Sequence, residues 1–426
     1  MRAIYWFRND LRLNDNPSLN LAVEKSNEIL FVYIHDISNE KNCPWGFKKM
    51  GQHRKLFLSQ GLEKLKLQLG EYNHSLNVYI DDSVSILNKL VKKYKIDNIY
   101  CESIKAFDEN KQIELLNEMK ISVYPFWQSS LFMQDQLPFI IKKLPNIFTN
   151  FRKAIELQDI KPNEPITFSK NIFNIGPVID NQSVFLDVSS IDYSKSSFPI
   201  THKDFLGGEK LGISYLKKYF ESEKPANYKI TRNELMGVNF STKFSPWLSM
   251  GYVSARQIFF FLDEYENRET KNESTYWIFF ELLWRDYFKF IVEKFNREIF
   301  HKQGLNFFKA EITHSSKNFN LWIRGETENN FINAGMTELK ETGFLSNRMR
   351  QIVASYLVNE LSCDWRAGAA WFESQLIDYD VCSNQCNWAY IAGCGTDPRG
   401  GRHFDIEKQR KTYDPHAKYV NFWTHS

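Results

Sequence analysis

The stretch RAIYWFRNDLR, residues 2–12, begins the chain with a short apolar run and a charged turn. Residues 2–7 are aromatic and β-branched, which is typical of a buried strand. Similar runs recur at 29–35, 76–80, 98–101 and 121–126, and amphipathic stretches at 51–69, 83–94 and 108–119 lie between them. This alternation predicts an α/β domain with a Rossmann-like parallel sheet covered by helices on both faces.

The sequence outside this region predicts two further parts. Residues 128–200 are rich in Ser, Asn, Pro and Asp, which favours a connector lying over the surface. From residue 201 to 426 helical periodicity dominates, which predicts a large all-α domain behind an α/β domain at 1–127. The clearest helices are expected at 211–220, 255–265, 275–295, 348–361 and 365–376.

Composition excludes several classes of protein. The chain has 426 residues, 43% hydrophobic and 25% charged, with a formal net charge of +3. Such a balance excludes a disordered protein, and no apolar run is long enough to span a membrane. Six cysteines in a chain of this length do not indicate a disulfide framework, and we expect a reduced, cytoplasmic protein. The aromatic content, 15%, is high enough to leave rings for functions other than packing.

The segment 275–295 carries charges in an otherwise apolar helix. One interpretation is a buried helix in which Glu281 pairs with Arg285 at a spacing of four residues. The other is that Glu281 and Trp284 line a cavity, where the carboxylate binds a base edge and the indole stacks on the base. Residues alone do not separate the two.

Two polar turns are candidate ligand sites. Asp378 and Asp380 precede Ser383, Asn384 and Gln385, a set that favours hydrogen bonds to a heteroaromatic ligand over a hard metal. The hydroxyl-rich turn STKFS, residues 241–245, suits either a phosphate or a simple capped loop. The cysteines at 382, 386 and 394 match no common zinc or iron–sulfur spacing, so we expect no metal.

Together these segments resemble the photolyase/cryptochrome family. The resemblance rests on FRNDLR (7–12), the turn at 241–245, ELLWRDY (281–287), SNRMRQ (346–351) and DWR (364–366). The stretches DYDVCSNQ (378–385) and GTDPR (395–399) narrow it to the cryptochrome DASH branch. It implies an antenna-binding type of α/β domain at 1–127 and a helical, catalytic domain at 201–426 that binds FAD.

The resemblance also implies which residues hold the cofactor. An amide at the flavin N5, here Asn384, can accept or donate a hydrogen bond without adding charge. The full set implied to bind FAD is Tyr228, Ser241, Thr242, Lys243, Phe244, Ser245, Arg285, Arg350, Asp378, Tyr379, Asp380 and Asn384.

An electron-transfer chain to the flavin is implied as well. Trp388 and Trp365 match its first two members, whereas Ile312 stands where the family commonly has a third tryptophan. Trp322 or a tyrosine is then the candidate for the end of the chain. The alternative for each indole is core packing.

The substrate implied is a pyrimidine dimer bound by Glu281, Trp284, Asn347, Gln351 and Tyr390. Tyr390 and Gln351 stand where dimer photolyases carry Trp and Met, and neither 347 nor 351 is the His of a (6-4) photolyase. With Tyr and Gln at these two positions, the pocket binds the dimer less tightly. Its binding energy then offsets less of the few kcal/mol needed to flip a dimer out of a duplex. We therefore expect a blue-light-dependent lyase of the deoxyribodipyrimidine photolyase type that prefers single-stranded DNA. We expect the protein to be a monomer. RNA is a further candidate partner, and we expect no membrane partner.

Two other functions are possible interpretations of the same residues, and several residues differ from the family pattern. A blue-light photoreceptor without repair would use the same flavin and tryptophans, although the short segment after Trp423 argues against it. A nucleic-acid-binding regulator is disfavoured by Glu281, Trp284 and Asn347. Cys386, Cys394 and Asn333 depart from the family pattern, and Gln136 near an acidic position bears on whether a folate antenna (methenyltetrahydrofolate) binds.

Overall fold

The computed structural model describes residues 1–424 except 181–183, 185, 187, 189, 190, 192, 194 and 307–311. Its N-terminal part contains the predicted parallel sheet. The strand order in this sheet is β3-β2-β1-β4-β5. A short strand, β6 (Gly176–Pro177), adds to β2. The other strands are β1 (Arg2–Phe7), β2 (Glu28–Asp36), β3 (Leu76–Asp81), β4 (Asn98–Glu102) and β5 (Val123–Phe126).

Helices cover both faces of this sheet because its strands are apolar on both faces. In β1, Tyr5 and Phe7 join the large core beneath α1 and α2, whereas Ile4 and Trp6 join a smaller core against α3 and α4. Their bounds are α1 (Pro17–Lys25), α2 (Gln52–Gly70), α3 (Ser83–Tyr94) and α4 (Phe107–Glu118). Helix α1 is short and was not among the predicted helices.

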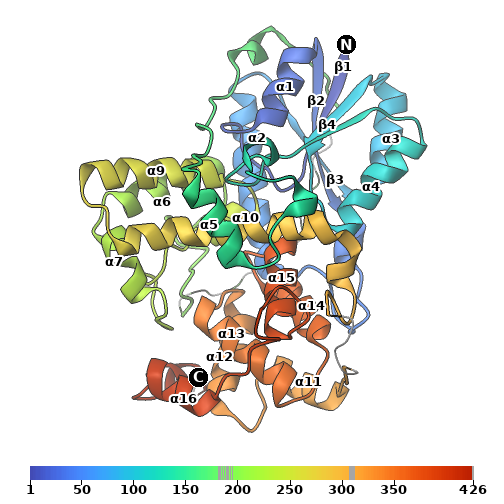
Figure 1. The fold of residues 1–426 in the computed structure, drawn as a ribbon. Helices are drawn as coiled ribbons and strands as arrows, with labels where there is room; N and C mark the ends of the chain where they lie inside the picture. The colour runs from blue at the N-terminus through green and yellow to red at the C-terminus, as the bar shows by residue number, and fades with distance from the viewer. Residues whose placement is uncertain are drawn as a thin grey trace.

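The regular elements that the structure describes in the C-terminal part are all helices, as predicted (Figure 1). Helix α10 crosses between the sheet and the helices α11–α15. The helices are α6 (Glu209–Phe220), α7 (Lys224–Thr231), α8 (Ser245–Ser249), α9 (Ala255–Arg268), α10 (Glu273–Phe295), α11 (Ser316–Arg324), α12 (Asn330–Thr342), α13 (Asn347–Asn359), α14 (Trp365–Gln375), α15 (Val381–Ile391), α16 (Ile406–Tyr413) and α17 (Lys418–Thr424).

The connector is more structured and more buried than its composition predicts. It contains α5 (Phe148–Leu157), which packs beside α10. Near its start, the backbone N–H groups of Leu131 and Phe132 donate to the buried carboxylate of Asp286 at 2.7 and 2.9 Å. The first part of the connector is thus fixed to the helical part and not laid over the surface.

The turn after β1 joins the two parts of the molecule. The Arg12 guanidinium donates to Gly251 O at 3.0 Å, and the buried pair of Arg256 and Asp15 closes at 3.0 Å. Gly251 has φ +67, and a Cβ there would lie 2.0 Å from Asn9 O. This turn, which would carry phosphate in a dinucleotide-binding sheet, serves here as a docking surface.

Candidate cofactor and substrate site

Helix α10 presents the charged residues around which the predicted site is built. Its N-terminus is capped by Asn272, which accepts from the N–H groups of Ser274 and Thr275. Glu281, Arg285 and Lys289 follow one another at intervals of four, so they share one face of the helix. Glu281 pairs with Arg232 at 2.6 Å and not with Arg285, which instead donates to Ser129 O and Leu248 O.

The acidic turn between α14 and α15 is held by three cations. Asp378 is buried, and its Oδ2 accepts from Ser245 Oγ at 2.6 Å and from Arg350 at 2.8 Å. Asp380 caps α15 through Ser383 N at 2.8 Å and pairs with Lys289 at 3.2 Å. Burial alone would raise the pKa of Asp380, but Lys289, Arg285 and the Ser383 hydrogen bonds lower it overall. Asp380 is therefore ionised at neutral pH.

The hydroxyl-rich turn before α8 has a strained backbone. Ser241 and Lys243 adopt φ values of 54° and 57°, in the left-handed region that side chains rarely occupy. Such a residue costs about 1–3 kcal/mol and persists where its surroundings fix it, often at ligand sites. At the end of this turn Ser245 donates a hydrogen bond to Asp378, so the predicted cofactor turns at 241–245 and 378–385 lie next to each other.

Two buried polar atoms beside these turns have no hydrogen-bond partner among the described residues. They are Lys243 Nζ and Asp378 Oδ1. Lys243 Nζ lies 3.2 Å from the centre of the Phe240 ring, and burial lowers the pKa of Lys243 well below its ordinary value. Buried polar groups normally have partners. A ligand with phosphate, hydroxyl and amide groups, as FAD has, would satisfy both atoms.

The remaining predicted cofactor residues lie at the same turns or on adjoining helices. Asn384 donates through Nδ2 to Ala369 O at 3.0 Å, which leaves its amide oxygen as the group for a ligand. Phe244 packs against Tyr219 with ring centres 5.0 Å apart, and Tyr228 is buried in α7. Tyr379 lies beneath Arg54 of α2, so its ring meets the N-terminal part. Thr242 is half-buried in the strained turn.

Trp284 is the centre of the predicted substrate side. Phe148 of the connector covers one face of its indole, with ring centres 3.7 Å apart and planes at 11°. Tyr390 meets it edge-on at 5.9 Å and 87°. The Tyr390 hydroxyl accepts from Arg402 at 2.7 Å, and Arg402 pairs with Asp397 at 3.0 Å. Phe148 therefore leaves Trp284 at most the opposite face of its indole for stacking on a base.

Glu281, one turn before Trp284, is partly buried. Burial raises the pKa of Glu281, and Arg232 opposes this. The Arg232 guanidinium also lies over the Trp277 ring at 4.7 Å. The carboxylate is thus close to a cation and an aromatic surface, both of which suit a heterocyclic base.

Asn347 and Gln351 mark the start of α13. Asn347 is exposed, and Gln351 accepts from Arg348 at 3.1 Å. Arg348 also donates to Asn233 at 3.2 Å and lies over the Tyr413 ring at 4.9 Å. Burial lowers the pKa of Arg348 and the nearby Arg232 lowers it further, so the two guanidinium groups share one electrostatic environment.

The three candidate electron-transfer indoles are all buried. The Trp388 ring meets that of Trp322 edge-on, with centres 6.1 Å apart and planes at 79°. A Cβ on Gly368, three residues after Trp365 in α14, would lie 2.2 Å from the Trp388 ring. Trp365 donates to Lys302 O at 2.9 Å. Ile312, the aliphatic residue at the third position, is half-buried against the core.

The sequence did not single out several residues that complete the site. The spacing of Lys289 could have identified it, because it lies four residues after Arg285 and so shares the helix face of Glu281 and Arg285. No pattern in the sequence indicates the other three residues, because each contacts a partner in a distant segment. They are Arg232, Phe148 and Arg402. Among the described residues no group of three His, Cys, Asp or Glu side chains could hold a metal, and the cysteines are free thiols.

Comparisons with known proteins cover most of the chain. The family described as "DNA photolyase" matches residues 3–167, and the family described as "FAD binding domain of DNA photolyase" matches residues 277–425. Cryptochrome DASH of Idiomarina loihiensis is 38% identical over 99% of this chain and 92% of its own. No helix in the described ranges is long and apolar enough to cross a membrane.

Solved structures give the same result for the fold. A cryptochrome from Synechocystis sp. superposes with a TM-score of 0.90 at 36% identity, over 99% of this chain and 88% of the other. An archaeal photolyase from Sulfolobus tokodaii, solved with two FAD molecules, superposes with a TM-score of 0.76 at 25% identity, over 99% and 90%.

Proposed function

Because this chain belongs to the cryptochrome DASH family of FAD-binding, photolyase-like proteins, we propose that it splits cyclobutane pyrimidine dimers under blue light, preferentially in single-stranded DNA. It would then be a lyase of the deoxyribodipyrimidine photolyase type, acting as a monomer, with RNA as a further candidate partner. The observation that carries this proposal is the arrangement of Trp284, Tyr390 and Glu281.

Trp284 and Tyr390 form two walls at 87°, and Glu281 lies one turn before Trp284 on α10. A flipped pyrimidine pair needs an aromatic surface to stack on and a polar group for its base edge. Glu281, paired with Arg232, supplies that polar group. Asn347 and Gln351 are proposed to contribute from the start of α13.

The preference for single strands follows from the limited stacking surface. Duplex extrusion costs a few kcal/mol, and each good base–aromatic stack returns about 1–3 kcal/mol. Phe148 already covers one face of Trp284, and Tyr390 offers less area than an indole. In single-stranded DNA the extrusion cost largely disappears, so the same pocket suffices.

FAD, when bound, would supply the electron that splits the dimer. The residues proposed to hold it are the turn at 241–245, with Lys243 Nζ available to an anionic group and Ser245 fixed by Asp378. Arg350 and Asp378 neutralise each other at 2.8 Å, and Asn384 offers its amide oxygen. Trp388, Trp365 and Trp322 are proposed to carry electrons to the cofactor.

A blue-light photoreceptor with little or no repair is the second candidate, since the buried indoles serve either role. A methenyltetrahydrofolate antenna in the N-terminal part also remains a proposal. Gln136, which stands near an acidic position of the family pattern, donates both amide hydrogens to Lys161 O and Asn163 Oδ1 and accepts from Met133 N, so only one lone pair of its Oε1 is left for an antenna.

The deciding experiment is a repair assay with dimer-containing oligonucleotides, single-stranded and duplex, in light and in darkness, using protein with chemically reduced FAD. We expect light-dependent repair that is faster on single strands. Glu281→Gln should slow it about tenfold on both, equivalent to about 1.4 kcal/mol, whereas Glu264→Gln, an exposed carboxylate on α9, should not. Equal rates on both substrates would refute the preference, and no repair of either would favour the photoreceptor.

A further inference from the structure

We infer that a branch of the electron path leaves Trp388 through Trp322 and ends at Trp45 on the surface of the N-terminal part. This inference rests on the proposed role of Trp388 as an electron donor to FAD. It adds a terminal donor, Trp45, that lies outside the helical part of the chain.

The first step of the branch is a close contact between two indoles. Trp388 and Trp322 lie edge-on with ring centres 6.1 Å apart. Phe372 fills the space beside them, 5.0 Å from Trp388 and 6.3 Å from Trp322. Electron transfer slows steeply with distance between rings, so a packed contact of this kind favours exchange between the two.

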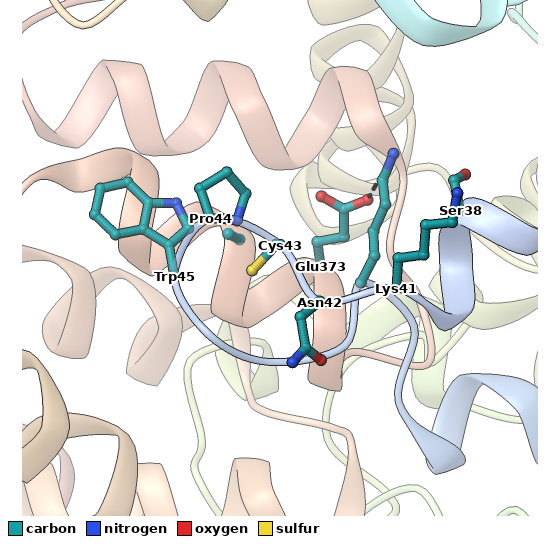
Figure 2. Close-up of a pocket in the computed structure, with 9 residues that line it drawn as sticks. Ser38, Lys41, Asn42, Cys43, Pro44, Trp45 and Glu373 are labelled. Atoms are coloured by element: carbon teal, nitrogen blue, oxygen red, sulfur yellow. Dashed lines mark ion pairs between the residues drawn. The ribbon is translucent and has the colours of Figure 1, made fainter.

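The second step crosses one further ring. Phe319 stacks on Trp322 at 6.1 Å and 25°, and Trp45 is one of three further rings around Phe319. Trp45 and Phe47 each lie 6.3 Å from Phe319, and His314 lies 5.6 Å from it. Phenylalanine is not readily oxidised, so it acts as a packed spacer. Figure 2 shows the Trp45 indole at one end of the loop of residues 41–45, which lines a shallow pocket at the surface.

Burial decides which indole ends the branch. Trp322 has no exposed surface, and its Nε1 donates to Val353 O at 3.1 Å, a carbonyl that cannot take up the proton. Its oxidised form therefore cannot relax by losing that proton. Trp45 is only half-buried, so water can accept its indole proton after oxidation. Trp322 is thus a relay and Trp45 the terminus.

The electrons balance as follows. With FAD bound and excited by light, Trp388 would give one electron to the flavin, Trp322 would return one to Trp388, and Trp45 would return one to Trp322. The Trp45 proton goes to water, so the net change is one electron gained by the flavin and one lost by Trp45. A thiol reductant in solution returns an electron to Trp45.

The test uses FAD-loaded protein without DNA and combines two measurements. Transient absorption gives the lifetime of the tryptophan radical, and mass spectrometry locates oxidised tryptophan after illumination in air. In a Trp365→Phe background, Trp45→Phe should shorten the radical lifetime and slow photoreduction severalfold. Trp371→Phe is the matched control, because Trp371 also packs at this surface, against Phe47, but lies outside the branch.

We expect light-dependent oxidation at Trp45 in loaded protein and none in protein stripped of FAD. Unchanged radical lifetimes in the Trp45→Phe protein, together with no oxidation at Trp45, would overturn the branch. Repair by chemically reduced protein needs no tryptophan chain. A failure to repair dimers would therefore count against the proposed function and leave the branch intact.

Discussion

The guanidinium of Arg232 lies 2.6 Å from the carboxylate of Glu281 and 4.7 Å above the ring of Trp277. One cation from the end of α7 thus controls the charge of the residue proposed to bind the dimer and also packs on α10. Burial raises the pKa of Glu281, and Arg232 keeps the carboxylate more acidic than burial alone would allow.

Arg232→Gln should raise the pKa of Glu281 further, because only the opposing effect of the cation is removed. At neutral pH the variant should be less stable by about 1 kcal/mol, because the Glu281 side chain is 33% exposed and water partly replaces the lost cation. As the pH falls through the raised pKa of Glu281, the carboxylate takes up a proton and loses its attraction to Arg232, so the deficit should shrink. Urea denaturation at pH 5 and pH 8 measures this; an equal deficit at both would mean that the pair does not set the charge.

Lys289→Met should destabilise the protein through Asp380. The lysine is one of the groups that keep the pKa of Asp380 low despite burial. Breaking such a pair costs about 3 kcal/mol. A lowered pKa gives stability that is present at neutral pH and lost in acid, so the deficit should diminish below about pH 4. Lys210→Met, at an ion pair with Glu71 in which both side chains are exposed, is the control in acid unfolding and should be nearly neutral.

Asp378→Asn should reduce the FAD content of purified protein severalfold. The amide would leave Arg350 without a charged partner and weaken the bond that fixes Ser245. Asp364→Asn removes a similar Asp–Arg pair, with Arg366, outside the site. It should retain full FAD, as measured by the ratio of flavin to protein absorbance. Equal FAD loss in both variants would point to general misfolding.

Gly368→Ala should displace the Trp388 ring. The added methyl group would lie 2.2 Å from a ring carbon, far inside contact distance. Overpacking of this kind costs about 1–3 kcal/mol, and flavin photoreduction should slow as the ring moves. Gly70→Ala in α2 is a suitable control, because nothing lies within 4 Å of its new methyl group. Calorimetry measures the stability of both variants, and flavin photoreduction rates measure the effect on Trp388. Equal values for the two variants would contradict the prediction.

Tyr390→Trp combined with Gln351→Met should shift repair toward duplex DNA. The larger ring adds stacking area that offsets part of the extrusion cost. The duplex to single-strand rate ratio should rise severalfold, although the hydrogen bond from Arg402 is lost. Tyr124→Trp, at an exposed ring on β5, should leave the ratio unchanged. No change in the double variant would place substrate choice outside this pocket.

Local patterns predicted most of the fold, and long-range contacts account for what they missed. The strands and α10 were readable because each has its own periodicity. Helix α5 carries an apolar face, with Phe148, Phe151 and Ile155, but it is short and surrounded by polar residues. The motif residues at 241–245, 378 and 350 do lie together. The Phe148–Trp284 stack and the Arg232–Glu281 pair join segments that no sequence spacing connects.

The buried pair of Arg256 and Asp15 has a consequence for protein engineering. Both charges are buried, and each is neutralised by a residue from the other part of the molecule. In an N-terminal half expressed alone, the Asp15 carboxylate would have lost its cation. In the helical half expressed alone, the Arg256 guanidinium would have lost its anion. Chimaeras between relatives should therefore exchange both residues together with the turn at 8–12, since each charge is neutralised only when the other is present.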